Sequence, residues 1–253
     1  MTEHDESPPS TTTRRRVLTA MGGIGLGAAA AGVLGGAASA APETPELLRC
    51  STILAPEEIE GPYYIQGEQL RSDITEGKPG VPVELSFTLV DVKRCVPLPN
   101  ASVDVWHCDA LGYYSGFTAN DPDSPALAGD DGVPTDDLTF CRGVQVSDTN
   151  GLVVFRTIYP GWYYGRTIHI HVKVYTGGRE VHTGQLYFQD QLTAQVAALD
   201  PYRTHQFRRW RNSEDFIYLQ QGGASSVLKV TQVRPGSVAD GLRASISLGL
   251  NVR

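Results

Sequence analysis

The sequence predicts an all-β protein: a single β-sandwich domain of mostly antiparallel strands, with long active-site loops and one short helix. Three observations support this fold class. Short segments alternate between apolar and polar residues, Gly, Pro and Asn turns separate them at regular spacing, and helical periodicity is scarce. The chain has 253 residues and no internal repeats, which suits one such domain behind a short leader.

Residues 1–40 differ from the rest and are predicted to be a twin-arginine export signal peptide. A basic TRRRVLT stretch at Thr13–Thr19 precedes a weakly apolar Gly- and Ala-rich run, and Ala38-Ser39-Ala40 forms a small-residue cleavage pattern. A membrane anchor is the alternative, but a spanning helix needs ~20 strongly apolar residues. We therefore expect a secreted or cell-envelope protein without stable membrane insertion after signal removal.

The net charge and the cysteine content indicate which kinds of ligand and which cellular compartment suit the protein. The net charge of −7 argues against a nucleic-acid ligand. The cysteines lack CxxC spacing, so we expect disulfides in an oxidising compartment and no zinc site built from thiolates. Three pairings are possible, and the preferred one is Cys50–Cys95 with Cys108–Cys141.

The predicted elements follow in order. Residues 41–59 are rich in Pro and Glu and form an extended arm, and residues 60–253 form the sandwich domain. Val83–Leu89 alternates strictly, as a half-buried strand does. A Pro-rich turn leads to a second strand over Val103–Cys108. The long polar loop over 115–138 has the length typical of an active-site lid or wall.

The β pattern then resumes over 139–147, and Asn150-Gly151 is a strong hairpin signal before the strand Leu152–Ile158. Pro160-Gly161 ends that strand. Further strands are expected over Ile168–Val174 and Val181–Phe188 around a Gly177-Gly178 turn, a helix over Gln191–Leu199, and closing strands over Phe216–Leu219 and Val227–Val233.

A His-x-His pair lies on the strand Ile168–Val174. His169 and His171 share one face, and Ile170 packs on the other. Their Cα atoms lie roughly 7 Å apart at the rise of an extended strand, so both imidazoles can reach one metal ion. Taken alone, such a pair is more often a polar face than a metal site.

Tyrosines near this strand favour the metal. Tyr163 and Tyr164 follow the Pro-Gly turn, and Tyr113 and Tyr114 follow the second strand. Zinc favours Cys, His and carboxylate ligands, and calcium favours oxygen cages. Phenol oxygen combined with imidazole nitrogen instead suits ferric iron, because two phenolates and one hydroxide neutralise a trivalent ion.

Four ordered motifs over Glu60–Asp190 carry a family resemblance: D-V-W followed by G-x-Y, then P-G-x-Y, R-x-x-H-x-H and Q-L-Y-F. In these motifs the chain resembles the intradiol ring-cleavage dioxygenases of the protocatechuate and catechol type. The segment EGPYYI at 60–65 resembles the family's pocket wall. The resemblance implies Fe(3+) bound by Tyr114, Tyr163, His169 and His171, with Tyr163 leaving when substrate binds and with Arg166 and Gln185 beside the substrate.

The activity that the resemblance implies is intradiol cleavage of catechol-type diols with O2, giving muconate-type dicarboxylic acids. Tyr113 and Tyr164 compete for the ligand roles, and register with the family disfavours them. The chain departs from the family in having only two residues between Tyr163 and Arg166, so the substrate cannot be transferred. The oligomeric state also remains open.

The alternatives are an exported carbohydrate- or protein-binding module and a copper or zinc enzyme. We expect His107, His182 and His205 to be structural or exposed. Trp106 and Trp162 are expected in the core or the pocket wall.

Overall fold

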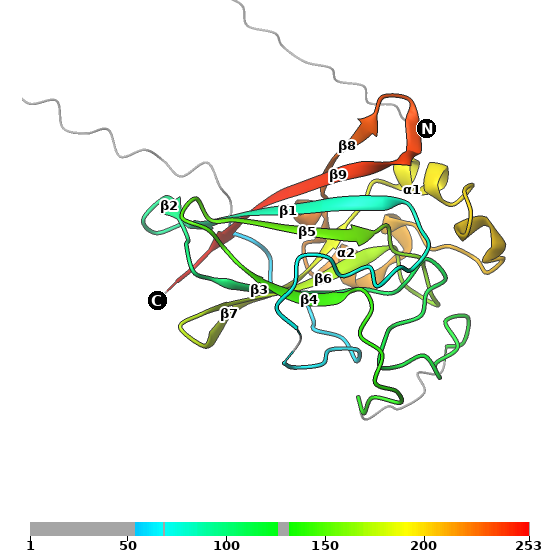
Figure 1. The fold of residues 1–253 in the computed structure, drawn as a ribbon, viewed down its shortest axis with the longest axis horizontal. Coiled ribbons are helices and arrows are strands. Elements are labelled where there is room, and N and C mark those ends of the chain that lie inside the picture. Colours follow the sequence, from blue (N-terminus) through cyan, green and yellow to red (C-terminus); the bar gives the residue numbers. More distant parts are fainter. Residues whose placement is uncertain (1–53, 68, 126–131, 253) are drawn as a thin grey trace, which may run out of the picture. The chain divides into compact units, whose positions relative to one another are not determined.

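The computed structural model describes residues 54–67, 69–125 and 132–252 as two β-sheets packed face to face (Figure 1). The predicted signal peptide and most of the predicted arm lie outside these residues. Among the helices of the described residues, none is long and apolar enough to cross a membrane. The all-β sandwich prediction is confirmed.

The first sheet is built around β1 (Pro82–Asp91). On one side β1 pairs antiparallel with β5 (Leu152–Ile158) and with the short β2 (Val96–Pro97). On its other side it pairs in parallel with β9 (Ser237–Leu250), which in turn pairs antiparallel with β8 (Lys229–Arg234). The strand β9 is the longest of the described strands, and it was not among the predicted ones.

The second sheet is antiparallel throughout and has the order β4-β3-β6-β7. Its strands are β3 (Ser102–Trp106), β4 (Arg142–Val146), β6 (His169–Thr176) and β7 (Arg179–Tyr187). The tight connection between β6 and β7 is the predicted Gly177-Gly178 hairpin. This sheet carries the two predicted histidines at the start of β6.

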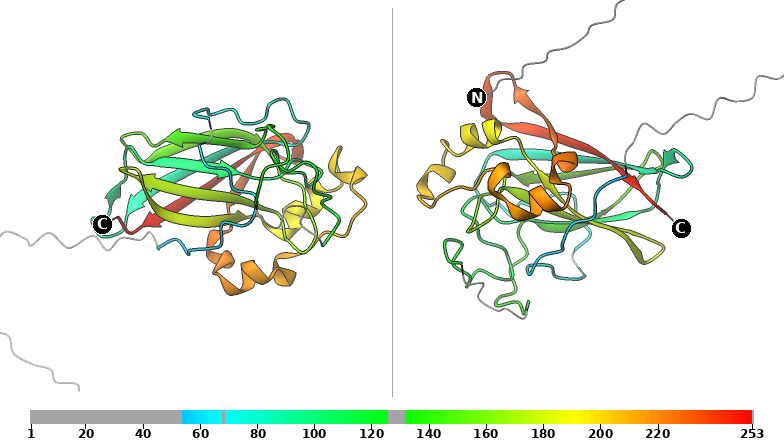
Figure 2. Two further views of the ribbon diagram at one scale, coloured as in Figure 1. Left: turned by 90° about the horizontal axis from the view of Figure 1, so that it is seen from below. Right: turned by 180° about the vertical axis from the view of Figure 1, so that it is seen from behind.

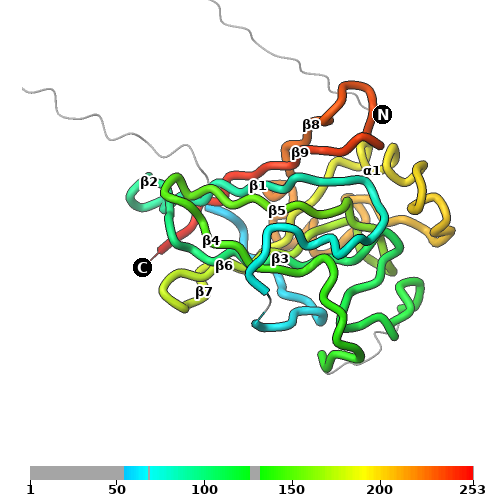
Figure 3. The backbone as a smooth tube through the Cα atoms, in the orientation of Figure 1, coloured from blue at the N-terminus to red at the C-terminus, as the bar shows by residue number. Residues whose placement is uncertain are grey.

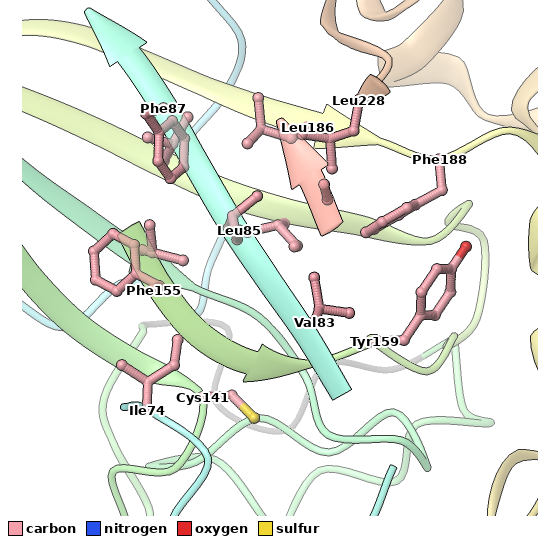
Figure 4. Close-up of a cluster of buried hydrophobic side chains, with 14 of the residues drawn as sticks. Ile74, Val83, Leu85, Phe87, Cys141, Phe155, Tyr159, Leu186, Phe188 and Leu228 are labelled. Atoms are coloured by element: carbon pink, nitrogen blue, oxygen red, sulfur yellow. The ribbon is translucent and has the colours of Figure 1, made fainter. Parts of the chain in front are cut away.

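The hydrophobic core lies between the sheets. The alternation in β1 is confirmed, since Val83, Leu85 and Phe87 are all buried. Figure 4 shows these side chains with Leu186 of β7 and Phe155 of β5 in one cluster. Burying apolar surface in this way supplies the dominant favourable term of folding.

One predicted hairpin and one predicted strand differ from the structure. The turn at Asn150-Gly151 forms, with the Gly151 amide donating to the Asp148 carbonyl at 3.0 Å. However, it joins β4 to β5, which belong to different sheets, so it is not a hairpin. The predicted closing strand over 216–219 is also wrong: α2 (Phe216–Gln220) forms there because the Asp215 carboxylate caps the amides of Ile217 and Tyr218. The predicted helix is α1 (Asp190–Val196).

The predicted Cys108–Cys141 disulfide is wrong. Both residues are buried free thiols. Cys108 packs among the aromatic residues around Tyr114, and its sulfur lies 3.6 Å from the Gly161 carbonyl oxygen. Cys141 instead belongs to the core between the sheets (Figure 4). The other predicted pair includes Cys50, which lies outside the described residues.

The two ends of the sandwich differ. Tight connections, including the β4–β5 turn and the β6–β7 hairpin, gather at one end, and long loops gather at the other (Figure 2). These loops include residues 107–125 and 159–168, which carry the predicted tyrosines. The fold therefore brings the candidate residues together at the loop end.

Candidate metal and active site

A row of polar and aromatic side chains crosses the second sheet on its outer face. Trp106 of β3 lies opposite His171 of β6 on one side and opposite Arg142 of β4 on the other. His171 in turn lies opposite Gln185 of β7. The rings of Trp106 and His171 stack at 4.8 Å with an angle of 7° between their planes. Cross-strand neighbours on one face pack in this manner, so the sheet fixes the orientation of His171.

Four donor atoms converge at the loop end of this row. The Nε2 atoms of His169 and His171 lie 3.0 Å apart. The hydroxyl oxygens of Tyr163 and Tyr114 lie 3.1 Å and 3.4 Å from His169 Nε2. Donor atoms about 2.0–2.1 Å from one shared ion are themselves ~2.9–3.4 Å apart. The four predicted side chains therefore fit a common ion.

The two tyrosine-bearing loops are held together by a close backbone approach. Gly112 has a φ of +92°, and a Cβ atom there would lie 2.3 Å from the Trp162 carbonyl oxygen. Only glycine permits this contact. Arg142, which is fully buried, donates to the Ser115 carbonyl at 2.7 Å and so fixes the chain beside Tyr114. Neither contact was predicted from the sequence.

The hydrogen bonds of His169 define its protonation pattern. Its Nδ1 lies 2.7 Å from the Thr167 carbonyl oxygen. A carbonyl can only accept, so Nδ1 carries the proton and Nε2 presents its lone pair to the site. Burial lowers the pKa of both His169 and His171 well below the usual value, and the nearby positive charge of Arg166 adds to this effect. Both rings are therefore neutral, as metal-binding imidazoles must be.

The phenols have the opposite shift. Burial raises the pKa of Tyr114 and of Tyr163 well above its ordinary value, and Arg166 partly offsets the rise at Tyr163. Deprotonating them at neutral pH requires a strong positive charge in the site, such as that of a bound cation. Tyr114 is 3% exposed and lies under the Tyr63 ring, which stacks on it at 4.4 Å. Tyr163 is less enclosed, so of the two it has more freedom to move.

A buried polar network positions the predicted arginine. Arg166 Nε donates to the carboxylate of Asp215 at 2.8 Å, and Nη2 donates to Gln185 Oε1 at 2.5 Å. Gln185 in turn donates to the Ile59 carbonyl at 2.9 Å. A two-residue turn places Arg166 directly beside Tyr163. Arg166 and Gln185 thus lie together beside the four donors, and Asp215 is a partner that the sequence did not reveal.

Residues 54–61 run along the outer face of the second sheet (Figure 3). Gly61 lies directly against His171, since a Cβ there would be 3.3 Å from the imidazole Cε1. Glu60 pairs with Lys173 of β6. Glu58, which is 5% exposed, accepts a hydrogen bond from Tyr187, and burial raises its pKa to about 7. Residues 58–61 therefore form one wall of the site.

The competing candidates lie elsewhere. Tyr164 is 43% exposed, and its ring lies 5.2 Å from that of Trp210, outside the group of four donors. The backbone of Tyr113 is hydrogen-bonded to Asp109. His107 bonds to Cys108 and Thr157. The other histidines are also engaged outside the site: His182 with Glu57 and His205 with Asp123.

A metal site made only of His, Cys, Asp and Glu is absent from the described part of the chain. The donor set is instead two imidazoles and two phenols. This set matches the preference of a hard, oxidised ion that also accepts nitrogen. The distances between the donors and the neutral histidines fit one transition-metal ion.

Comparisons with known proteins agree with this geometry. The dioxygenase family profile matches residues 59–198. An intradiol ring-cleavage dioxygenase from Tetranychus urticae is 34% identical with a TM-score of 0.71, over 79% of this chain and 94% of that one. The dioxygenase domain of a carbohydrate-binding fusion from the cellulolytic bacterium Streptomyces sp. SirexAA-E is 28% identical with a TM-score of 0.55, over 79% of this chain and all of that one (100%).

Catechol 1,2-dioxygenase of Acinetobacter baylyi is 33% identical over 113 residues, which are 43% of this chain and 32% of that enzyme. This chain thus matches about a third of that enzyme's length. The matching family model places this β-sandwich, with its phenol–imidazole centre, among the dioxygenases. The chain belongs to the intradiol ring-cleavage dioxygenase family.

Proposed function

We propose that this protein cleaves ortho-diphenols between their two hydroxyl-bearing carbons, using O2 and ferric iron, and acts as an exported enzyme. The observation that carries the proposal is the convergence of four donor atoms, three of which lie within 3.0–3.4 Å of the fourth, His169 Nε2. Tyr114, Tyr163, His169 and His171 would hold the iron. When bound, it would supply Lewis acidity that activates the diphenol toward O2.

The chain's own residues would handle protons and charge. Because burial raises the pKa of Tyr163, its phenolate is a strong base and is suited to take the proton of one substrate hydroxyl. Tyr114 stays enclosed under Tyr63 and would keep its place. Arg166, held by Asp215 and Gln185, would orient the diphenol and stabilise negative charge that develops on it.

The overall reaction balances without an organic cofactor. Both atoms of O2 enter the product, so catechol would give a muconate-type dicarboxylic acid and no external reductant is consumed. The family match does not support the alternative of a binding module. A carbohydrate- or protein-binding surface also does not need four converging metal donors.

The test uses purified full-length protein loaded with ferric iron. We expect a coloured protein, one O2 consumed per ring opened, and a muconate-type product spectrum with catechol, protocatechuate or hydroxyquinol. Metal analysis should find one iron and neither copper nor zinc. An iron-loaded protein that takes up no O2 with any ortho-diphenol, or that opens the ring beside the hydroxyls, would overturn the proposal.

A further inference from the structure

A narrow recess leads from the metal-site phenols to the protein surface. Tyr114 and Tyr163 line its inner end, Tyr63 and Phe117 form part of its wall, and Tyr164 lies at its outer end. Aromatic rings form five of its eleven lining residues, and polar Asn120, Asp121 and Ser124 are among the others. Sites lined in this way bind flat apolar ligands, with a few polar groups setting their orientation.

The aromatic surface continues past Tyr164 into a cluster outside the metal site. The Tyr164 ring lies 5.2 Å from that of Trp210 and 6.1 Å from that of Phe207, and Phe207 and Trp210 are 5.7 Å apart. Arg208 lies over the Trp210 ring at 4.9 Å. We call Tyr164, Phe207 and Trp210 the aromatic rim. All three remain at least partly accessible to solvent.

Hydrogen bonds hold the aromatic rim in place. The Tyr164 amide donates to the Pro122 carbonyl at 2.7 Å. The Trp162 indole donates to the Phe207 carbonyl at 3.0 Å, and the His205 ring stacks on the Trp162 ring at 4.8 Å. Three chain segments are thus tied together around the mouth of the recess. A surface built in advance loses little entropy when a ligand binds.

We propose that the aromatic rim is a subsite for a second aromatic ring, so that the substrates are ortho-diphenols bearing an aryl substituent. This rests on the proposed function. A diphenol bound at the inner end of the recess would direct its substituent outward past Tyr163 to Tyr164. The substituent ring would stack on or against the rim, an arrangement that aromatic pairs favour beyond simple burial.

The test compares catechol with 4-phenylcatechol in the iron-loaded, full-length protein. The measured quantity is the ratio of kcat/KM for 4-phenylcatechol to kcat/KM for catechol. Tyr164→Ala and Trp210→Ala should each lower this ratio about fivefold or more. Tyr164→Phe keeps the ring and should retain the wild-type ratio. A ratio that is unchanged in both alanine variants, or that falls equally in Tyr164→Phe, would overturn the subsite.

A binding measurement separates this proposal from the proposed function. Anaerobic calorimetry with the same two diphenols reports affinity without turnover. The wild type should bind 4-phenylcatechol several-fold more tightly than catechol, and Trp210→Ala should abolish the difference. Loss of all O2 uptake with this preference intact would contradict the activity alone. Equal affinity for both diphenols in the wild type would refute the subsite alone.

Discussion

Asp215 holds Arg166 through a hydrogen bond of 2.8 Å between its carboxylate and the guanidinium Nε, with the carboxylate fully buried. The same carboxylate oxygen accepts from the Thr167 amide at 2.8 Å. Its other oxygen caps α2. One side chain therefore joins the predicted substrate-orienting arginine, the entry to β6 and a helix terminus.

Replacing this carboxylate should impair catalysis more than iron binding. Asp215→Asn keeps a capping side chain but removes the charge that fixes Arg166, and we expect kcat/KM to fall about tenfold to a hundredfold. Iron content by metal analysis should stay near the wild-type level. Asp200→Asn, which removes an exposed ion pair with Arg203, is the control and should change neither quantity. Equal kcat/KM in both variants would contradict a positioning role for Asp215.

The neighbouring tyrosines form two matched pairs. Tyr114→Phe and Tyr163→Phe should each lower iron affinity and weaken the visible phenolate-to-iron absorption, because each removes a ligand oxygen. Tyr113→Phe and Tyr164→Phe should leave both nearly unchanged, since these hydroxyls do not reach the donors. Titration with iron, followed by absorbance, checks all four. A loss of colour in Tyr164→Phe with retention in Tyr163→Phe would reverse the assignment.

The titration of Glu58 should lower the free energy of unfolding as pH rises. Burial raises its folded-state pKa from 4.5 to about 7, so the protonated form favours folding below pH 4.5 and this contribution is lost as pH rises through 7. Glu58→Gln should be more stable than the wild type at pH 8 by roughly 1–3 kcal/mol and similar at pH 5. Urea unfolding at both pH values measures this. The exposed Glu84→Gln should show no such difference, and a pH-independent effect of Glu58→Gln would refute the assignment.

His107 should act in the opposite direction. Burial lowers its pKa from 6.5 to about 4. Between pH 4 and pH 6.5, His107 is therefore protonated in the unfolded chain and neutral in the folded protein. Its contribution to stability is complete above pH 6.5 and falls by roughly 3 kcal/mol as pH drops to 4. His107→Gln should flatten this part of the stability curve. An unchanged acid slope would show that His107 is not the titrating group.

The two buried thiols can be counted directly. Alkylation of the unreduced protein in denaturant, followed by mass spectrometry, should label Cys108 and Cys141, because the structure has both as free thiols. In the folded protein both should react slowly, since burial raises their pKa. A peptide that links Cys108 to Cys141 would contradict the structure.

Local patterns predicted much of the fold. Strict alternation identified β1, and the Gly-Gly turn identified the β6–β7 hairpin. The hairpin signal at Asn150-Gly151 described the turn correctly but not the pairing, because a turn does not determine which sheet the next strand joins. The strand β9 was missed although Leu242, Ala244 and Leu248 alternate with polar residues and are buried, so its second half was readable from the sequence. Its first half, which includes Gly241, lacks this alternation and is stabilised by pairing with β8.

The strand period placed His169 and His171 on one face, but only the family resemblance chose Tyr114 and Tyr163 over the adjacent Tyr113 and Tyr164. Asp215 was missed although its position before an apolar run is a helix N-cap signal. Recognising that cap would have replaced the predicted strand with α2. Arg142 could not be identified from spacing, since its role depends on which loops meet across the sheet. Tyr63 lies in the segment 60–65, which only the family resemblance marked as a pocket wall.

The separation of tight connections from long loops has a practical consequence. The β6–β7 hairpin lies at the end of the sandwich away from the candidate site (Figure 1), and beside Gly177 and Gly178 nothing lies within 4 Å of a Cβ position. Lengthening this hairpin with a tether would fix the protein to a support in a known orientation. The mouth of the recess would then face the surrounding liquid, ready for phenolic solutes.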